Sequence, residues 1–270
     1  RVLGIRRVGH GGTLDPAVTG VLPIAVGQAT RLLPYLPGEK TYRGVIQLGV
    51  TTNTDDMEGE ELSRQVVPEL CPEGLEQALD QFRGPIAQHP PQVSAVHVDG
   101  ERAHARARRG EVMQLQARPV TIHQLHLLGW DASRAQLRLE VHCSAGTYIR
   151  SLARDLGKAL GCGGCLASLR RTQALGFHDD QAVPLPDAPE AVGKGAITLL
   201  RPELALAHLP KRTLSSSEQD DWSFGRRITP GVDGSADAVI VLSESGRMLG
   251  LGLPDAEGGV KPKVVFEARG

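Results

Sequence analysis

The segment Val8–Pro16 (VGHGGTLDP) places a single carboxylate, Asp15, after a run of glycines and directly before a proline. Proline disfavours the helical conformation of the residue before it, so Asp15 is expected in an extended or turn segment. Glycines lack a Cβ and let a large planar ligand or a second backbone approach closely. A carboxylate in this setting suits a nucleophile or an acid/base group facing a bulky substrate. The alternative is a glycine-rich turn that ends in an Asx-turn residue.

Two tyrosines and an arginine occur in short motifs that could complete such a site. Aromatic residues make up only 3% of the chain, so Tyr42 of KTYR and Tyr148 of GTYIR are informative. Arg150 follows Tyr148 by two residues at the start of a predicted helix, and its guanidinium against Asp15 would keep that carboxylate ionised and oriented. The alternatives are a surface arginine and a core tyrosine with one satisfied hydroxyl.

A basic stretch follows Pro90-Pro91 and could contact phosphates, although a solvated charged helix would have the same composition. Its basic residues are Arg102, His104, Arg106, Arg108, Arg109 and Arg118. The acidic segment 54–60 (TDDMEGE) lacks the alternating spacing of an EF-hand loop, so a turn is favoured over a metal site. The run GHGG lacks the GK[ST] ending of a phosphate-binding loop.

Composition indicates an ordinary globular protein of 270 residues with a formal net charge of −1. A polyanionic partner must therefore be held by a local basic surface, since the overall field is weak. Cys162-Gly-Gly-Cys165 has no second pair or nearby histidine, so reduced buried thiols are expected rather than a zinc or redox site. No membrane-spanning segment or signal peptide is predicted, and the cytoplasm is the expected compartment.

The helices and strands that must position these residues are predicted from hydrophobic periodicity and from the glycines and prolines that end each element. We expect helices over residues 29–36, 72–82, 101–109 and 146–160. We expect strands over residues 20–27, 40–49, 93–98, 120–128, 135–143, 238–242, 248–253 and 263–266, with a loop over 51–61. The strands 120–128 and 135–143 should pair antiparallel around Gly129-Trp130-Asp131. The short β-like runs after Leu204 predict a small, β-barrel-like second domain.

These motifs, in order from Arg7 to about Thr172, resemble the TruB-type tRNA pseudouridine synthases. The resemblance is carried by GHGGTLDP, TGVLPIAVGQATRL, KTYRGVIQLGVTTNTDDMEGE, PPQVSAVHVDGERAHARARRGE, HCSAGTYIRSLARDLG and LRRT. It implies an α+β fold: a catalytic domain with a central mixed, mostly antiparallel β-sheet flanked by helices and loops, plus a small C-terminal β-barrel-like PUA-type domain. The implied division is a catalytic domain over 1–200, an RNA-binding insertion over about 88–118, and a PUA-like domain over 205–270.

The resemblance also implies an activity and roles for particular residues. Members isomerise the T-arm uridine of tRNA, position 55, to pseudouridine without a cofactor or metal. Asp15 matches the catalytic aspartate, and Arg150 matches the arginine paired with it. Tyr42 matches the tyrosine that stacks on the target base and takes part in later proton removal from C5. The carboxylate could attack the sugar C1′ or remove a C2′ proton, and sequence does not separate these routes.

Further residues are implied to bind the substrate. Tyr148 and Leu169 match residues packing around the target base, and His10 matches the histidine that enters the T loop and supports the everted nucleotide. The insertion, with Arg102, Arg106 and Arg109, matches the segment that clasps RNA. The implied partner is the tRNA T stem-loop, acted on by a monomer with no protein partner and no membrane.

Two departures from the family pattern stand out. The lysine-proline-containing strand and turn that usually precede the catalytic loop are absent from the sequence, and Gly12 replaces a residue that is more often threonine. Two alternative functions stay open: a guide-RNA-dependent relative that modifies ribosomal RNA, and a tRNA-binding or tRNA-folding module with secondary catalysis. The insertion favours the stand-alone enzyme over the guided one.

Overall fold

The computed structural model describes residues 3–98, 100–184, 198–229 and 237–269. Its contacts divide the chain into two compact units. One comprises residues 14–21 and 38–174, and the other comprises residues 1–13, 22–37 and 175–270. The expected domain boundary at about 200–205 stays a prediction.

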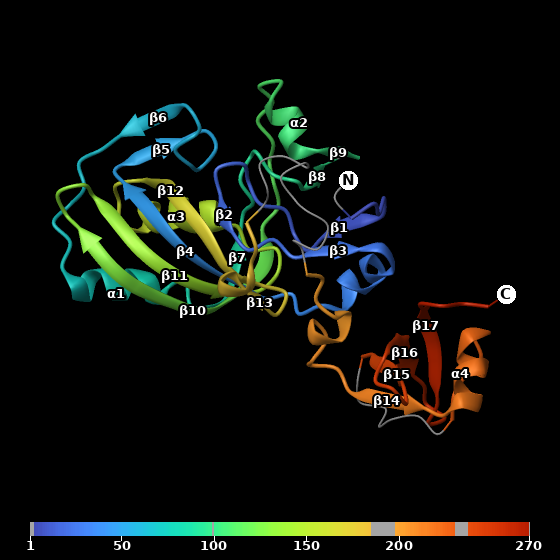
Figure 1. The fold of residues 1–270 in the computed structure, drawn as a ribbon. Coiled ribbons are helices and arrows are strands. Elements are labelled where there is room, and N and C mark those ends of the chain that lie inside the picture. The colour runs from blue at the N-terminus through green and yellow to red at the C-terminus, as the bar shows by residue number, and fades with distance from the viewer. Residues whose placement is uncertain (1–2, 99, 185–197, 230–236, 270) are drawn as a thin grey trace. The chain divides into compact units, whose positions relative to one another are not determined.

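The described residues of the larger unit contribute six strands to its main sheet (Figure 1). Five strands follow the order β12-β4-β11-β10-β7 and are antiparallel, and β2 pairs with β12 in parallel. Their bounds are β2 Thr19–Gly20, β4 Lys40–Leu48, β7 Gly84–Gln88, β10 Arg118–Asp131, β11 Gln136–Cys143 and β12 Gly164–Ala174. The predicted α+β class with a mixed, mostly antiparallel sheet is confirmed.

Two helices of this unit are α1 (Pro72–Asp80) and α3 (Ile149–Ala159). The apolar face of α3 contributes Ile149, Leu152 and Leu156 to the same buried cluster as Ile46 and Leu48 of β4. Alternation along β4 puts every second side chain into this core. The helix and the sheet are therefore joined by one continuous apolar core, which holds the first turn of α3 in a fixed position.

Smaller elements complete the larger unit. Two hairpins are formed by β5 (Val50–Thr52) with β6 (Glu61–Arg64) and by β8 (His97–Val98) with β9 (Glu101–Arg102). The short helix α2 spans Ala103–Ala107. Residues 53–60, between β5 and β6, form the loop called here the acidic loop.

The other unit contains a four-stranded sheet of order β14-β15-β16-β17. Its strands are β14 Lys211–Leu214, β15 Val239–Ser243, β16 Met248–Pro254 and β17 Val260–Val265, with helix α4 at Ser216–Ser223. The expected C-terminal β domain is thus present. Its other elements are β1 Val8–His10, β3 Ile24–Val26, η1 Gly27–Tyr35, β13 Phe177–His178, η2 Asp179–Gln181 and η4 Pro202–Leu204.

Several predicted boundaries are wrong, each for a local reason. The helix expected over 29–36 is a 3₁₀ helix, because Pro34 lacks an N–H and disfavours α geometry before it. The buried strand expected over 20–27 is split, and Ile24 is 53% exposed. The hairpin turn expected at 129–131 lies after Asp131, whose carboxylate accepts the Ser133 and Arg134 N–H groups.

The insertion also contains less regular structure than predicted. Only His97–Val98 of the expected 93–98 strand is paired, because the Val93 and Ser94 carbonyls accept hydrogen bonds from Arg150 and His104 instead. The helix expected over 101–109 begins only at Ala103. The helix expected over 146–160 begins at Ile149, because Gly146 has φ +84° and Tyr148 is extended. Among the helices described, none has the length and apolar character that a bilayer crossing needs.

Candidate active site

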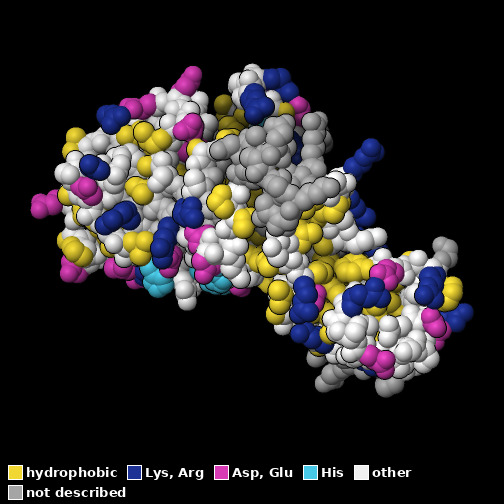
Figure 2. Space-filling model, in the orientation of Figure 1, with side chains coloured by type: hydrophobic (Ala, Val, Ile, Leu, Met, Phe, Trp, Pro, Cys, Tyr) yellow, Lys and Arg dark blue, Asp and Glu magenta, His cyan; other side chains and the backbone are white. Residues whose placement is uncertain are grey.

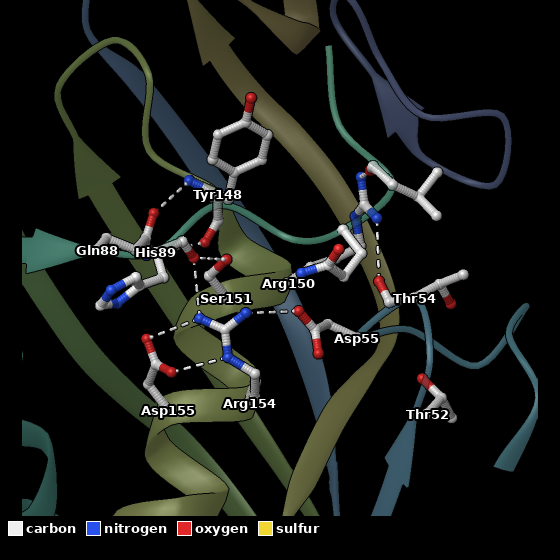
Figure 3. Close-up of polar contacts among 12 residues, drawn as sticks. Thr52, Thr54, Asp55, Gln88, His89, Tyr148, Arg150, Ser151, Arg154 and Asp155 are labelled. Carbon is white, nitrogen blue, oxygen red and sulfur yellow. Dashed lines mark hydrogen bonds and ion pairs between the residues drawn. The ribbon is translucent and has the colours of Figure 1, made fainter. Parts of the chain in front are cut away.

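The first turn of α3 presents a buried arginine with fixed partners. Arg150 is 6% exposed, and its Nη1 donates to the Thr54 carbonyl at 3.0 Å while Nη2 donates to the Val93 carbonyl at 3.0 Å. Its Nη2 lies 2.9 Å from Asp15 Oδ2 and its Nε 3.5 Å from Asp56 Oδ2. Carbonyls from two loops and two carboxylates therefore share one guanidinium, whose planar fork fixes their directions. Figure 3 shows Arg150 with Thr54 at this end of α3.

Asp15 is both a turn residue and an ion-pair partner. Its carbonyl accepts the Val18 N–H at 2.9 Å, which closes a turn with Pro16 at the second position. Its side chain is 49% exposed and contacts Arg150. The contact expected between Asp15 and Arg150 is therefore present, while the other carboxylate face is open to solvent. Such a group is oriented and reachable, as a nucleophile or base must be.

The acidic loop is a turn, as expected, but it also supplies counter-ions that the sequence reading missed. Asp56 Oδ1 accepts from the Thr54 hydroxyl at 2.6 Å and from the Glu58 N–H at 3.1 Å, and its Oδ2 faces Arg150. Asp55 Oδ2 lies 2.8 Å from Arg154 Nη1. The signal available in the sequence was an acidic run and two arginines spaced by four on one helix. Nothing in the sequence showed that these segments meet.

Tyr42 lies on the sheet face covered by α3. It is 8% exposed and belongs to the main apolar core. Arg171 of β12 is directly opposite Tyr42 in the sheet, is fully buried, and hydrogen-bonds the phenol. Burial raises the pKa of Tyr42 to about 12, and the nearby charge of Asp15 adds to that rise. Tyr42 is thus a core residue close to Asp15, and stacking on a base stays a prediction.

Leu169 and Tyr148 flank this region. Leu169 pairs with Gly44 across the sheet, two residues from the Tyr42–Arg171 pair and on the same face, and packs against the core. Tyr148 precedes α3, and its half-buried ring packs against the cluster of Val96, Ala103, Met113 and Leu115. Binding of the target base by Tyr148 and Leu169 stays a prediction.

A buried glutamine that the sequence reading missed fixes the backbone of Tyr148. The Gln88 side-chain amide donates to the Tyr148 carbonyl at 3.1 Å and accepts its N–H at 2.8 Å. The next residue, His89, uses its carbonyl to accept from Ser151 at 2.8 Å and from Arg154 at 2.9 Å. The start of the insertion is therefore attached along the first turns of α3 (Figure 3).

His10 and the glycines before Asp15 lie in the other unit. His10 ends β1, and its side chain is exposed. A Cβ on Gly11 would overlap the side chain of Leu175, and one on Gly9 would lie 3.0 Å from Leu33 Cδ1. The interpretation of these glycines as clearance for a ligand is wrong for Gly9 and Gly11, which are small because other side chains pack on them. Gly12, at φ +99°, serves the turn of the chain.

The arginines of the insertion are exposed, apart from the half-buried Arg106, and mostly paired. Arg109 lies 2.6 Å from Glu101 and 2.8 Å from Glu111, and Arg106 lies 2.7 Å from Glu111. Arg102 donates to the Ala95 carbonyl at 3.3 Å. Figure 2 shows dark blue and magenta side chains together over α2. The surface thus carries cations near solvent with exchangeable partners, and contact with RNA stays a prediction.

No cation site accompanies these groups in the described part of the chain, where no three His, Cys, Asp or Glu side chains are placed to hold a metal. Cys162 and Cys165 are buried and free, as expected, and burial raises the pKa of the Cys165 thiol to about 11. A neutral buried thiol is a poor ligand and nucleophile.

Comparison with protein families covers nearly the whole chain. Residues 1–149 match the TruB family pseudouridylate synthase N-terminal domain, and residues 150–201 match the tRNA pseudouridylate synthase B C-terminal domain. Residues 210–266 match the C-terminal domain of pseudouridine synthase II TruB. The first two matches divide at the start of α3, so the described site draws residues from both.

Relatives of known name agree with these matches. Over 274 residues the chain is 75% identical to tRNA pseudouridine synthase B of Synechococcus sp. (strain WH7803), covering 100% of this chain and 91% of that protein. It is 67% identical to the protein of the same name from Synechococcus sp. (strain CC9311), with the same coverage.

Solved structures of similar fold include a Cbf5–Nop10–Gar1 complex, with a TM-score of 0.70 and 25% identity over 99% of this chain and 79% of that chain. Another is an H/ACA RNP bound to a substrate RNA containing 2′-deoxyuridine, with a TM-score of 0.70 over 98% of this chain and 78% of that one; at 24% identity it supports the fold alone. From the family matches and the identity to named relatives, the chain belongs to the TruB family of pseudouridylate synthases.

Proposed function

We propose that this protein isomerises the T-arm uridine of tRNA, position 55, to pseudouridine with Asp15 as the catalytic carboxylate. The observation that carries the proposal is the half-exposed Asp15 carboxylate held 2.9 Å from the buried guanidinium of Arg150. Relatives up to 75% identical are named tRNA pseudouridine synthase B, which supports tRNA as the substrate.

The reaction needs a group that handles a sugar carbon and a uracil ring in turn. The N-glycosidic bond breaks, the detached uracil turns, and a carbon–carbon bond forms from its C5 to C1′, after which C5 loses its proton. Asp15 serves either by attacking C1′ or by removing the C2′ proton to give a glycal. Because Arg150 binds Oδ2, Oδ1 is the oxygen proposed to face the sugar.

Arg150 supplies orientation and charge to this carboxylate. Its four partners leave it little freedom, so the direction of Asp15 is set before substrate arrives, and preorganised groups cost no reorganisation during reaction. The second carboxylate, Asp56, lies near the Nε side of the same guanidinium at 3.5 Å. The two carboxylates share one cation, which moderates how strongly Arg150 stabilises the anion of Asp15.

The uridine must leave its stack to reach Asp15. Everting a base costs a few kcal/mol, less in a loop than in a duplex, and contacts with the protein offset part of it. We assign Tyr42, Tyr148 and Leu169 to the base and His10 to the loop that it leaves. The phenol of Tyr42, kept neutral by its high pKa, is suited to pack against an uncharged ring rather than to carry a charge.

A guide-RNA-dependent activity on ribosomal RNA is the main alternative. The solved structures of similar fold include complexes with Nop10 and Gar1, whereas the relatives above 60% identity are named for tRNA. We therefore propose that the chain acts alone, as a monomer, on naked tRNA. Pseudouridine formation by the purified chain on an unmodified T stem-loop supports this, and a requirement for a guide RNA or added proteins contradicts it.

The carboxylate assignment is tested by Asp15→Asn and Asp15→Ala, assayed for pseudouridine in a T-arm stem-loop. Loss of a reacting group should lower turnover at least about a thousandfold, while stem-loop affinity changes little. Asp131→Asn is a matched control, because Asp131 also accepts backbone N–H groups in an exposed turn. Unchanged turnover in Asp15→Asn would end the proposal. If these variants bind and fold tRNA and still replace the wild type in cells, the tRNA-folding alternative accounts for its role in the cell.

A further inference from the structure

Helix α3 carries a second arginine, Arg154, one turn after Arg150. Its Nη1 lies 2.8 Å from Asp55 Oδ2, its Nε donates to Asp155 at 2.9 Å, and its Nη2 donates to the His89 carbonyl at 2.9 Å. Figure 3 shows Arg154 between the two carboxylates. The side chains of Arg154 and Asp55 are 29% and 15% exposed, so this ion pair is mostly withdrawn from water and less screened than a surface pair.

Asp55 has an uncommon backbone conformation. Its φ of 62° lies in the left-handed region, which few residues other than glycine adopt, although aspartate and asparagine tolerate it best. Its carbonyl accepts the Leu166 N–H at 2.9 Å, and burial raises the pKa of its carboxyl. A buried carboxylate in a strained turn is costly without a cationic partner. Arg154 is that partner.

The residues on either side of Asp55 are the ones that contact Arg150. The Thr54 carbonyl accepts from Arg150 at 3.0 Å, and Asp56 Oδ2 lies 3.5 Å from its Nε. Three consecutive loop residues therefore meet two arginines spaced one turn apart on α3. Because Asp55 is bonded to both Thr54 and Asp56, we expect a shift of Asp55 to disturb both contacts with Arg150.

We propose that Arg154 is a positioning residue of the active site. By holding Asp55 it sets where the acidic loop meets Arg150, and through Arg150 it sets the direction of Asp15. This inference rests on the proposed function, because it requires Asp15 to be the reacting carboxylate. Reaction rates fall steeply when a reacting group is displaced by about an ångström, so a residue that never touches substrate still controls the rate.

A direct contact of Arg154 with an RNA phosphate is the competing role. Arg154 lines a hollow of about 590 Å³ together with His89, Gln92, Gln114 and Gln116. Positioning is favoured because each of the three guanidinium nitrogens already donates to at least one protein partner. The two roles differ in what they change: a phosphate contact contributes to affinity and its salt dependence, whereas positioning contributes to the rate of the bound complex.

The test is Arg154→Met, measured in single turnover with enzyme in excess over a T-arm stem-loop. We expect a rate roughly ten- to a hundredfold lower, with the stem-loop Kd within about twofold of wild type. Arg154→Lys should recover part of the rate, since it keeps the charge without the planar fork. Asp55→Asn keeps a residue that tolerates positive φ and removes only the charge, so it should act in the same direction and serves if Arg154→Met does not fold.

Arg83→Met is the matched control. Arg83 has a side chain 33% exposed, pairs with Glu76 at 2.8 Å and donates to the Leu125 carbonyl at 2.6 Å, so its setting resembles that of Arg154 away from Asp15. Arg83→Met should lower the thermal midpoint by a similar amount and leave the single-turnover rate unchanged. Equal rate losses in Arg83→Met and Arg154→Met would show that Arg154 is merely structural.

Coupling to Asp56 provides the sharpest check. If Arg154 acts through the acidic loop, the combination of Arg154→Met with Asp56→Asn should cost less than the product of the two single effects. The inference would be overturned by any of three results: a double variant whose rate loss equals the product of the two single losses, a wild-type rate in Arg154→Met, or a loss confined to Kd. Activity in Asp15→Asn would refute the proposed function itself. An inactive Asp15→Asn beside an Arg154→Met that behaves like the control would refute only the positioning role.

Discussion

The arginines at the start of α3 and those around α2 are chemically identical and structurally opposite. The side chain of Arg150 is 7% exposed and is bound by two backbone carbonyls and two carboxylates. The side chain of Arg109 is 51% exposed and is bound by Glu101 and Glu111, whose side chains are 45% and 38% exposed. Both arginines are ion-paired, but only the guanidinium of Arg150 is buried.

This difference separates orientation from binding. Exposed ion pairs contribute little to stability, so we expect the carboxylates of the insertion to exchange for RNA phosphates at little cost. A buried guanidinium has no such freedom, because water cannot replace a protein partner that it loses. The start of α3 is therefore suited to hold a reacting group still, and the insertion is suited to hold a polyanion loosely.

Replacing Arg150 by lysine should give the largest effect. A lysine keeps the charge but cannot serve two carbonyls and two carboxylates at once, so we expect the single-turnover rate to fall about 100- to 1,000-fold. Arg150→Met should in addition lower the free energy of unfolding by about 1–3 kcal/mol, because it leaves the Thr54 and Val93 carbonyls without their hydrogen-bond donor. Rate and urea unfolding are measured on the same preparations. A wild-type rate in Arg150→Lys would show that the buried arginine at the start of α3 does not orient a reacting group.

The buried Tyr42 should make the free energy of unfolding depend on pH. Its pKa is raised from 10.0 to about 12 in the folded protein, so between these values the folded state keeps a proton that the unfolded state has lost. The stabilising contribution is complete below pH 10 and is lost as the pH rises towards 12, by roughly 2–3 kcal/mol. Urea unfolding of the wild type and of Tyr42→Phe from pH 9 to 12 measures it. An identical pH slope in both proteins would contradict the prediction.

Removing the charges of the insertion should give a smaller effect, on binding alone. With Arg106→Gln and Arg109→Gln together, we expect stem-loop affinity to fall about tenfold at low salt and the slope of log K against log salt to decrease by about 1–2. The rate at saturating enzyme should be unchanged. The double variant Glu101→Gln with Glu111→Gln is the matched control with the opposite expected sign. It removes the carboxylate partners of the same arginines, so it should increase stem-loop affinity. A loss of rate in the arginine variant would place these residues with Arg150 instead.

Much of the fold could be predicted from local pattern. The alternation from Lys40 gave β4 almost to the residue, and the apolar spacing within 146–160 gave α3 apart from its first turn. One strand prediction failed because backbone carbonyls accept hydrogen bonds from outside the sheet instead of pairing with a neighbouring strand. The strand expected at 93–98 is reduced to two residues because the carbonyls of Val93 and Ser94 bond to Arg150 and to His104.

At the site, the residue types and their motifs could be recognised in the amino-acid sequence: Asp15 before a proline and Arg150 at a predicted helix start. The folded structure was needed to find that the acidic loop contacts Arg150, that Arg154 pairs with Asp55, and that Tyr42 is buried against Arg171. These contacts join residues that lie far apart along the chain. Thr54 and Arg150 are 96 residues apart, Asp55 and Arg154 are 99 apart, and several partners are backbone carbonyls that every residue possesses. Residue types state which contacts are possible, and packing of the sheet against α3 selects the ones that form.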